Sequence, residues 1–98
     1  MYTIKSLPEF TDWLNSLKDP TTQRRLLVRL RKVTLGNLGD VKSVGQGVFE
    51  MREHFGAGWR MYYVQHERVV FVMLGGGGKS TQPTDIARAI KLAATLEE

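Results

Sequence analysis

Residues 48–64, VFEMREHFGAGWRMYYV, have the alternation of two β-strands joined by a turn at residues 56–58. The alternation places Arg52, His54, Arg60 and Tyr62 on one face. If the strands close around this three-residue turn, Arg52 lies opposite Tyr62 and His54 lies opposite Arg60. The other face is apolar except for Glu53 and is formed by Phe49, Met51, Phe55, Trp59, Met61 and Tyr63. Since one face suffices to build a core, the cationic face predicts a phosphate-handling surface or, in the plainer interpretation, a solvated one.

Length and composition limit the possible functions. Ninety-eight residues predict one domain, residues 1–98, with a single core and no separate cofactor domain. The chain contains no cysteine, and its two histidines lack metal-ligand spacing, so we expect neither a metal nor a cofactor. We find no signal-peptide pattern and no long apolar run, and we therefore expect a soluble cytoplasmic protein without a membrane partner. A formal charge of +4 favours an anionic partner.

The order of elements follows from periodicity and capping residues. We expect short strands at 2–5 and 40–44, a helix from a Ser6–Glu9 capping box to about residue 18, and a second helix from Asp19 and Pro20 to Gly36. After the hairpin, the apolar run 69–74 predicts a central strand in a meander, and Pro83 opens a final helix. This order predicts an α+β fold: a small antiparallel sheet with an N-terminal helical hairpin and a C-terminal helix.

The second predicted helix has a uniformly cationic polar face. No acidic residue occurs between Asp19 and Asp40, whereas five basic residues lie in that helix: Arg24, Arg25, Arg29, Arg31 and Lys32. Like charges on a helix repel one another, so an anionic partner such as nucleic acid or an acidic protein is one interpretation. An ordinary solvated helix is the other.

The glycine tract 75–78 is followed by Lys79 and Ser80, which suggests a phosphate-binding loop. That motif requires a glycine at position 73, where this chain has Met73, so the match fails. We instead expect a flexible strand end that presents Lys79 to a phosphate, or a mobile loop with a solvated lysine.

Cleavage of RNA without a metal needs a base for the 2′-hydroxyl, cations for the charge that grows on phosphorus, and a proton donor. Arginine and lysine supply the cations, and tyrosine or histidine can transfer protons where neighbouring charges shift their pKa. We expect Tyr63 to lie in the core and His66 at a hairpin turn. This leaves Tyr62 and His54 as the proton-transfer candidates, although Arg52 and Arg60 can also simply pair with Glu50 or Glu53.

The chain resembles the phage Gp49-like, HigB-type branch of the RelE/ParE toxin superfamily over almost its entire length. The resemblance lies in FTDWLNSLKD, in RLRKVTLGNLGDVKSVGQGVFEMREHFGAGWRMYYV and in LGGGGKSTQPTDIARAIKLA. Its most specific markers are residues 36–40 (GNLGD), Glu50-x-Arg52, Gly58 with Trp59-Arg60-x-Tyr62, and Lys79-Ser80 before Asp85-Ile86. The fold that the resemblance implies agrees with the order of elements expected from periodicity.

The resemblance also implies which residues act. Arg60 and Lys79 match the family positions that stabilise the scissile phosphate, and Arg52 and Lys42 are further basic matches. Ile86 falls near the position of the acid–base tyrosine in RelE, so Tyr62 or His54 takes over that role, or catalysis relies on orienting the 2′-hydroxyl and stabilising the phosphorane. The helix residues Arg24, Arg25, Arg29, Arg31 and Lys32, with Lys42, are the predicted nucleic-acid-binding residues.

By this resemblance the protein is the toxin of a type II toxin–antitoxin system, a metal-independent mRNA endoribonuclease that acts on the ribosome, inhibits translation and arrests growth. Its implied partners are the ribosome, mRNA and a cognate antitoxin, a small helix-turn-helix DNA-binding protein. Two alternatives remain open. ParE-like relatives inhibit DNA gyrase without being enzymes, and an inactive relic would only bind its antitoxin.

Overall fold

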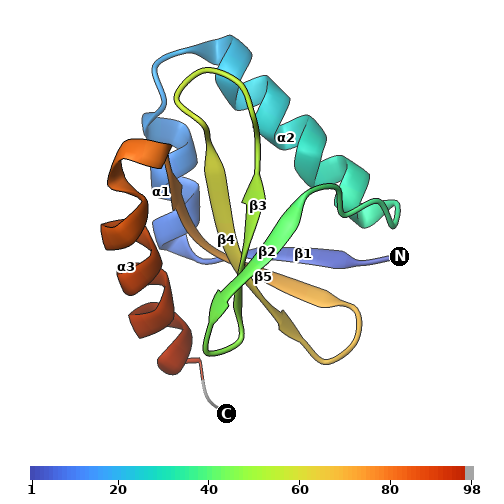
Figure 1. Ribbon diagram of the computed structural model, residues 1–98. Helices are drawn as coiled ribbons and strands as arrows, with labels where there is room; N and C mark the ends of the chain where they lie inside the picture. The colour runs from blue at the N-terminus through green and yellow to red at the C-terminus, as the bar shows by residue number, and fades with distance from the viewer. Residues whose placement is uncertain (97–98) are drawn as a thin grey trace.

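The computed structural model describes residues 1–96 and contains a five-stranded sheet with helices on both faces (Figure 1). The chain order is β1 (Thr3–Ser6), α1 (Pro8–Ser16), α2 (Pro20–Thr34), β2 (Val41–Gly45), β3 (Val48–Arg52), β4 (Arg60–His66), β5 (Val70–Gly77), the 3₁₀ turn η1 (Lys79–Thr81) and α3 (Gln82–Ala94). The strands lie in the order β1-β5-β4-β3-β2. The predicted α+β fold, with its helical hairpin, meander and C-terminal helix, is confirmed.

The sheet is mixed rather than purely antiparallel. β2 to β5 form the expected antiparallel meander, but β1 pairs in parallel with β5 at the edge of the sheet. A short turn forces antiparallel pairing only between strands that are consecutive in the chain. β1 and β5 are separated by two helices and three strands, so no turn constrains their relative direction.

Alternation along the strands divides the core into two parts. On one face, the helical hairpin packs through Phe10, Leu26 and Leu30 onto side chains such as Met61 and Phe71. Tyr63 belongs to this core, as expected, and its ring stacks on Phe71 with centroids 4.6 Å apart. On the other face, α3 packs through Ala89 and Ile86 onto a second cluster that contains Val48, Tyr62 and Leu74.

The helix ends follow local chemistry, with one exception. Asp19 caps α2 by accepting from the backbone N–H of Thr21 at 3.1 Å, Pro20 is the first residue of that helix, and Gly36 follows its end at a φ of +97°. The predicted capping box at Ser6 is wrong. Ser6 lies in β1, because the next backbone N–H, of Leu7, donates to the carbonyl of Met73 in β5 and prolongs the strand pairing.

The central hairpin has a longer connection than predicted. Arg52 pairs with Arg60 and Glu50 with Tyr62, so the register differs by two residues from the expected one and His54 lies outside the strands. β3 ends at Arg52, whose backbone N–H donates to the carbonyl of Asp40 and whose carbonyl accepts from the Arg29 guanidinium. The next backbone N–H, of Glu53, still donates to the carbonyl of Trp59 across the hairpin. A shift of two residues leaves each side chain on its predicted face, so Arg52, Arg60 and Tyr62 still share one.

The glycine tract is part of the sheet. β5 continues to Gly77, whose partner is Arg60, so the predicted end of this strand at residue 74 is wrong by three residues. The face that we expected to meet solvent is also covered, because α3 lies across it.

None of the helices within residues 1–96 is long and apolar enough to span a membrane.

Candidate functional site

Two arginines and one carboxylate form the centre of the candidate site. Arg52 on β3 and Arg60 on β4 are cross-strand neighbours, and their Nε atoms lie 3.6 and 3.7 Å from the carboxylate of Glu50. Glu50 is 1% exposed and accepts a hydrogen bond of 3.0 Å from the side chain of Gln82 at the start of α3. One negative charge therefore faces two positive charges, and the cluster retains an excess of one positive charge.

The arginine donors are not fully used. Within residues 1–96 the buried Nε atoms of Arg52 and Arg60 have no hydrogen-bond partner. An unsatisfied buried donor costs free energy, of the order of 1–3 kcal/mol or more for a charged group. Natural structures keep such groups chiefly where a ligand or water completes them. Both Nε atoms face the Glu50 carboxylate inside the protein, and the two guanidinium groups together carry one positive charge more than that carboxylate neutralises.

Gly58 brings Arg60 and Lys79 together. Arg60 donates through Nη1 to the carbonyl of Gly58, and the backbone N–H of Lys79 donates to the carbonyl of Ala57 at 2.9 Å. Gly58 has a φ of +70°, and a Cβ at this position would lie 3.2 Å from Arg60 Nη1 and 3.3 Å from Lys79 Cβ. Only glycine combines this conformation with such close approach. Arg60 and Lys79, the predicted phosphate pair, therefore both lie against Gly58, where Lys79 is exposed and Arg60 is buried.

Tyr62 lies beside this pair but is fully buried under α3. Burial, together with the nearby carboxylates of Glu50 and Asp85, raises the pKa of Tyr62 far above its ordinary value of 10.0, although Arg60 opposes the shift. Its hydroxyl has no hydrogen-bond partner among the described residues. Tyr62 is therefore a neutral donor at physiological pH and cannot serve as a base there.

His54 lies apart from the strand face. It belongs to the connection between β3 and β4, its side chain is 69% exposed, and its Nε2 lies 2.7 Å from Oδ2 of Asp40. This hydrogen bond is the main reason why the pKa of Asp40 is below its ordinary value of 3.8. The second histidine, His66, is the last residue of β4 and lies next to the turn, as expected.

Arg29 is a structural residue, and its predicted place on the exposed basic face is wrong. Its guanidinium is buried, donates to the carbonyls of Leu38, Asp40 and Arg52, and forms an ion pair with Glu53. It thus joins α2 to the segment before β2 and to the end of β3. A guanidinium that is committed to four acceptors has little capacity left for nucleic acid.

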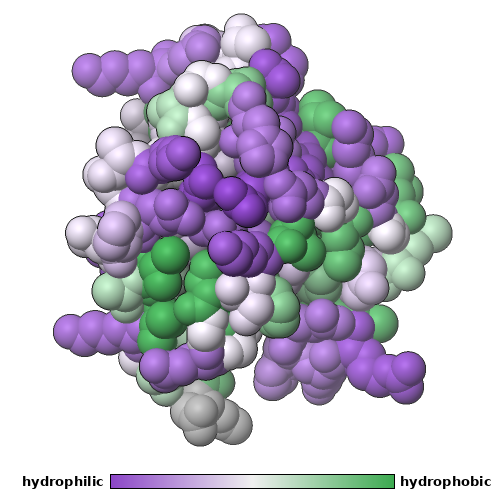
Figure 2. Space-filling model, in the orientation of Figure 1, coloured by the Kyte–Doolittle hydropathy of each residue, from purple (hydrophilic) through white to green (hydrophobic). Residues whose placement is uncertain are grey.

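The remaining basic residues of α2 are exposed: Arg24, Arg25, Arg31 and Lys32. Arg25 lies over the ring of Phe55, 3.7 Å from its centroid, which fixes part of this face. Figure 2 shows mainly hydrophilic side chains across the upper half of the molecule, over α2, with a few hydrophobic ones among them. Lys42 lies on β2 as the cross-strand neighbour of Glu50 and is exposed as well.

Sequence reasoning missed the role of Gln82 and underrated Glu50. No local pattern links these residues, because 32 positions separate them and only the packing of α3 on the sheet brings them together. No group of three or more His, Asp or Glu side chains in residues 1–96 is arranged to hold a metal ion.

Comparison with known proteins places the chain in a family. Residues 12–97 match the family described as phage derived protein Gp49-like. An uncharacterized protein of Haemophilus influenzae is 40% identical over 93 residues, which cover 95% of this chain and 94% of that protein. The match begins within α1 and spans α2, the meander with Arg60, and Lys79. The chain therefore belongs to the Gp49-like family of phage-derived proteins, a family of toxin-like proteins of the RelE/HigB type.

Proposed function

We propose that this protein is the toxin of a type II toxin–antitoxin pair and that it cleaves mRNA on the ribosome, in the cytoplasm, without a metal. Family membership supports a toxin with an antitoxin partner. The observation that carries the nuclease proposal is that Arg60 and the exposed Lys79 both lie against Gly58.

In this proposal the scissile phosphate contacts Lys79 first and then Arg60, and the two cations hold the charge that grows on phosphorus. Arg52 adds positive charge, while Glu50 and Gln82 keep both guanidinium groups in position. The exposed basic residues of α2, with Lys42, bind phosphates farther along the message.

Proton transfer is the weaker part of the site. Tyr62 keeps its proton at neutral pH and is fully buried under α3, so its hydroxyl reaches neither the scissile phosphate nor the 2′-hydroxyl. His54 lies outside the strand face. The rate enhancement would therefore come mainly from orienting the 2′-hydroxyl and from stabilising the phosphorane.

The test is a translation reaction with purified ribosomes and a defined message, in which new RNA ends are mapped. Lys79→Ala is the decisive variant because Lys79 is exposed, and we expect cleavage to fall about 10²- to 10³-fold, as when one transition-state donor is removed. Arg60→Ala should have a similar effect, with folding checked by circular dichroism. Lys91→Ala removes the same charge from an exposed position on α3 and should cut normally.

The burial of Tyr62 and the place of His54 outside the strands leave the described strand face without an accessible proton-transfer group, which favours a second candidate, a ParE-like inhibitor of DNA gyrase that needs no proton transfer. An intact message in the translation reaction, combined with growth arrest in cells, would overturn the nuclease proposal. A supercoiling assay with purified gyrase then tests this second candidate. Neither cleavage nor arrest would indicate an inactive relic that only binds its antitoxin.

A further inference from the structure

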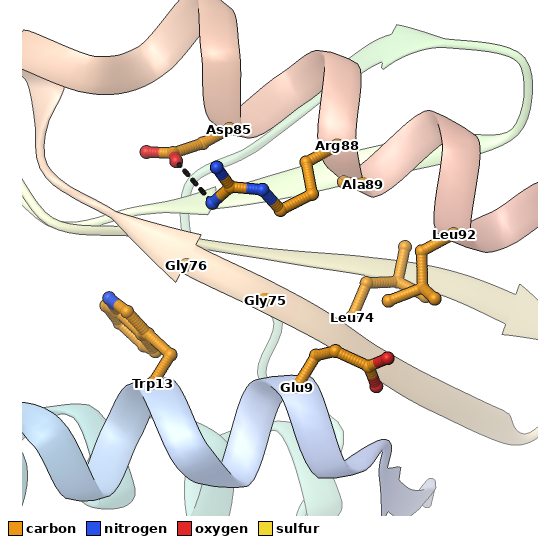
Figure 3. A pocket seen from close by; sticks show the side chains of 9 residues that line it. All are labelled: Glu9, Trp13, Leu74, Gly75, Gly76, Asp85, Arg88, Ala89 and Leu92. Carbon is orange, nitrogen blue, oxygen red and sulfur yellow. Dashed lines mark ion pairs between the residues drawn. The ribbon is translucent and has the colours of Figure 1, made fainter.

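A groove runs between α1 and α3 over the glycine-rich end of β5. It consists of an inner pocket of about 80 Å³ and an open part of about 320 Å³, and both are lined by Trp13, Gly76, Asp85 and Arg88. Figure 3 shows Trp13 rising from α1 and Arg88 reaching from α3 over the strand between them. The site described above does not include this groove.

The glycines determine the depth of the groove. A Cβ on Gly76 would lie 2.5 Å from the ring of Trp13, and a Cβ on Gly77 would overlap the carboxylate of Asp85. Both side chains therefore reach the sheet only because these positions have none. At Gly75, in contrast, a Cβ would meet no atom within 4 Å, so this part of the floor is open space.

One wall of the groove is aromatic and the other carries an exposed cation. Trp13 and Trp59 are both half-buried, and their ring centroids lie 6.2 Å apart. The side chain of Arg88 is 71% exposed and, within residues 1–96, forms an ion pair with Asp85 at 3.7 Å. Tryptophan faces and arginine planes are the surfaces on which single-stranded nucleic acids stack their bases.

The groove opens towards the phosphate pair. Its outer part is bordered by Ala57, Gly78 and Ser80, and Lys79 lies among these residues, bonded through its backbone to Ala57. A nucleotide whose phosphate contacts Lys79 therefore has its base next to the aromatic wall. The carboxylates of Glu9 and Asp85 would repel a phosphate, but they can accept hydrogen bonds from the amino group of a neutral base.

We propose that this groove binds one unstacked base of single-stranded RNA, which stacks against Trp13 and Trp59 while the adjoining phosphate contacts Lys79. This inference rests on the proposed function and names where the message is held beside the scissile phosphate. A protein segment is the competing occupant.

Tryptophan fluorescence tests the proposal directly, since Trp13 and Trp59 are the only tryptophans of the chain. The probe is a single-stranded RNA tetranucleotide of mixed sequence, and ribose 5-phosphate is the control without a base. We expect the tetranucleotide to quench the fluorescence in a saturable way and ribose 5-phosphate to leave it unchanged. Fluorescence that does not respond to the tetranucleotide would overturn the proposal.

Gly75→Leu places an apolar side chain in the groove at a position where a Cβ would meet no atom within 4 Å, and circular dichroism checks its folding. We expect the affinity measured by quenching to fall about tenfold or more, as when one stacked base is lost. Arg88→Ala should weaken binding several-fold, whereas Lys91→Ala, on the same helix but outside the groove, should not. Unchanged affinity in Gly75→Leu would overturn the proposal.

Parallel cleavage assays separate this inference from the proposed function. If wild-type protein cuts ribosome-bound message while RNA does not quench its fluorescence, the groove proposal fails and the nuclease proposal stands. If RNA quenches the fluorescence in a Gly75-dependent way but the message stays intact, the groove binds a base and the nuclease proposal fails. Quenching by a purified antitoxin but not by RNA would assign the groove to the protein partner.

Discussion

Replacing Arg29 by methionine should destabilise the protein strongly, because this guanidinium joins three segments of the fold. It donates to the carbonyls of Leu38, Asp40 and Arg52 and pairs with the carboxylate of Glu53. Methionine keeps most of the apolar stem of the side chain, so the change isolates the loss of the charged head.

The magnitude follows from what remains unpaired. A hydrogen bond to a charged group contributes about 1.5–3 kcal/mol, and removing one partner of a buried ion pair costs about 3–5 kcal/mol. These contributions overlap and do not add. Glu53 keeps 19% of its side chain exposed, so water can partly solvate its carboxylate. We therefore expect the free energy of unfolding to fall by about 3–4 kcal/mol, a large part of the about 5–15 kcal/mol typical of a domain.

Urea denaturation followed by circular dichroism measures this change, with the slope checked for two-state behaviour. Arg31→Met is the matched control, because Arg31 lies in the same helix and is exposed, and its effect should stay within about 0.5 kcal/mol. A loss below about 1 kcal/mol for Arg29→Met, or a loss equal to that of the control, would refute the structural role assigned to Arg29.

Three further predictions concern space and titration. Gly77→Ala should lower the free energy of unfolding by about 1–3 kcal/mol, because its Cβ overlaps a carboxylate of α3, whereas Gly75→Ala meets open space and should fold normally; thermal melts compare the two. In an alkaline titration followed by tyrosinate absorbance, Tyr62 should ionise only as the protein unfolds. Because the pKa of Tyr62 is raised in the folded protein, its contribution to stability is complete below about pH 10 and is lost as the pH rises further. Ionisation of all three tyrosines before unfolding would contradict this. His54→Ala should raise the pKa of Asp40 towards 3.8, and carboxyl chemical shifts measure this change. Because the pKa of Asp40 is lowered in the folded protein, its contribution to stability is present at a pH above 3.8 and is lost as the pH falls below that value. An unchanged Asp40 titration would show that the hydrogen bond does not hold in solution.

The sequence by itself determined the order of elements and the face on which each strand residue lies. Helix boundaries such as Asp19 and Gly36 depend on hydrogen bonds and dihedral angles within a few residues, and these are visible in local sequence. The shared face of Arg52, Arg60 and Tyr62 follows from the two-residue period of a strand. A register shift of two residues leaves every side chain on the same face. Resemblance to a family singled out Arg60 and Lys79, and the fold brings them together at Gly58.

Only the tertiary structure decided which of these side chains are accessible and what they contact. Arg29 is buried because its guanidinium binds the end of β3 and the segment before β2, and the burial of Tyr62 depends on α3, which packs across the sheet. Likewise the glycine tract is a strand because it pairs with β4, and Trp13 and Asp85 from two helices pack closely against it. These contacts join residues that lie far apart in the chain, and their free energy comes from packing and hydrogen bonds that no local pattern encodes.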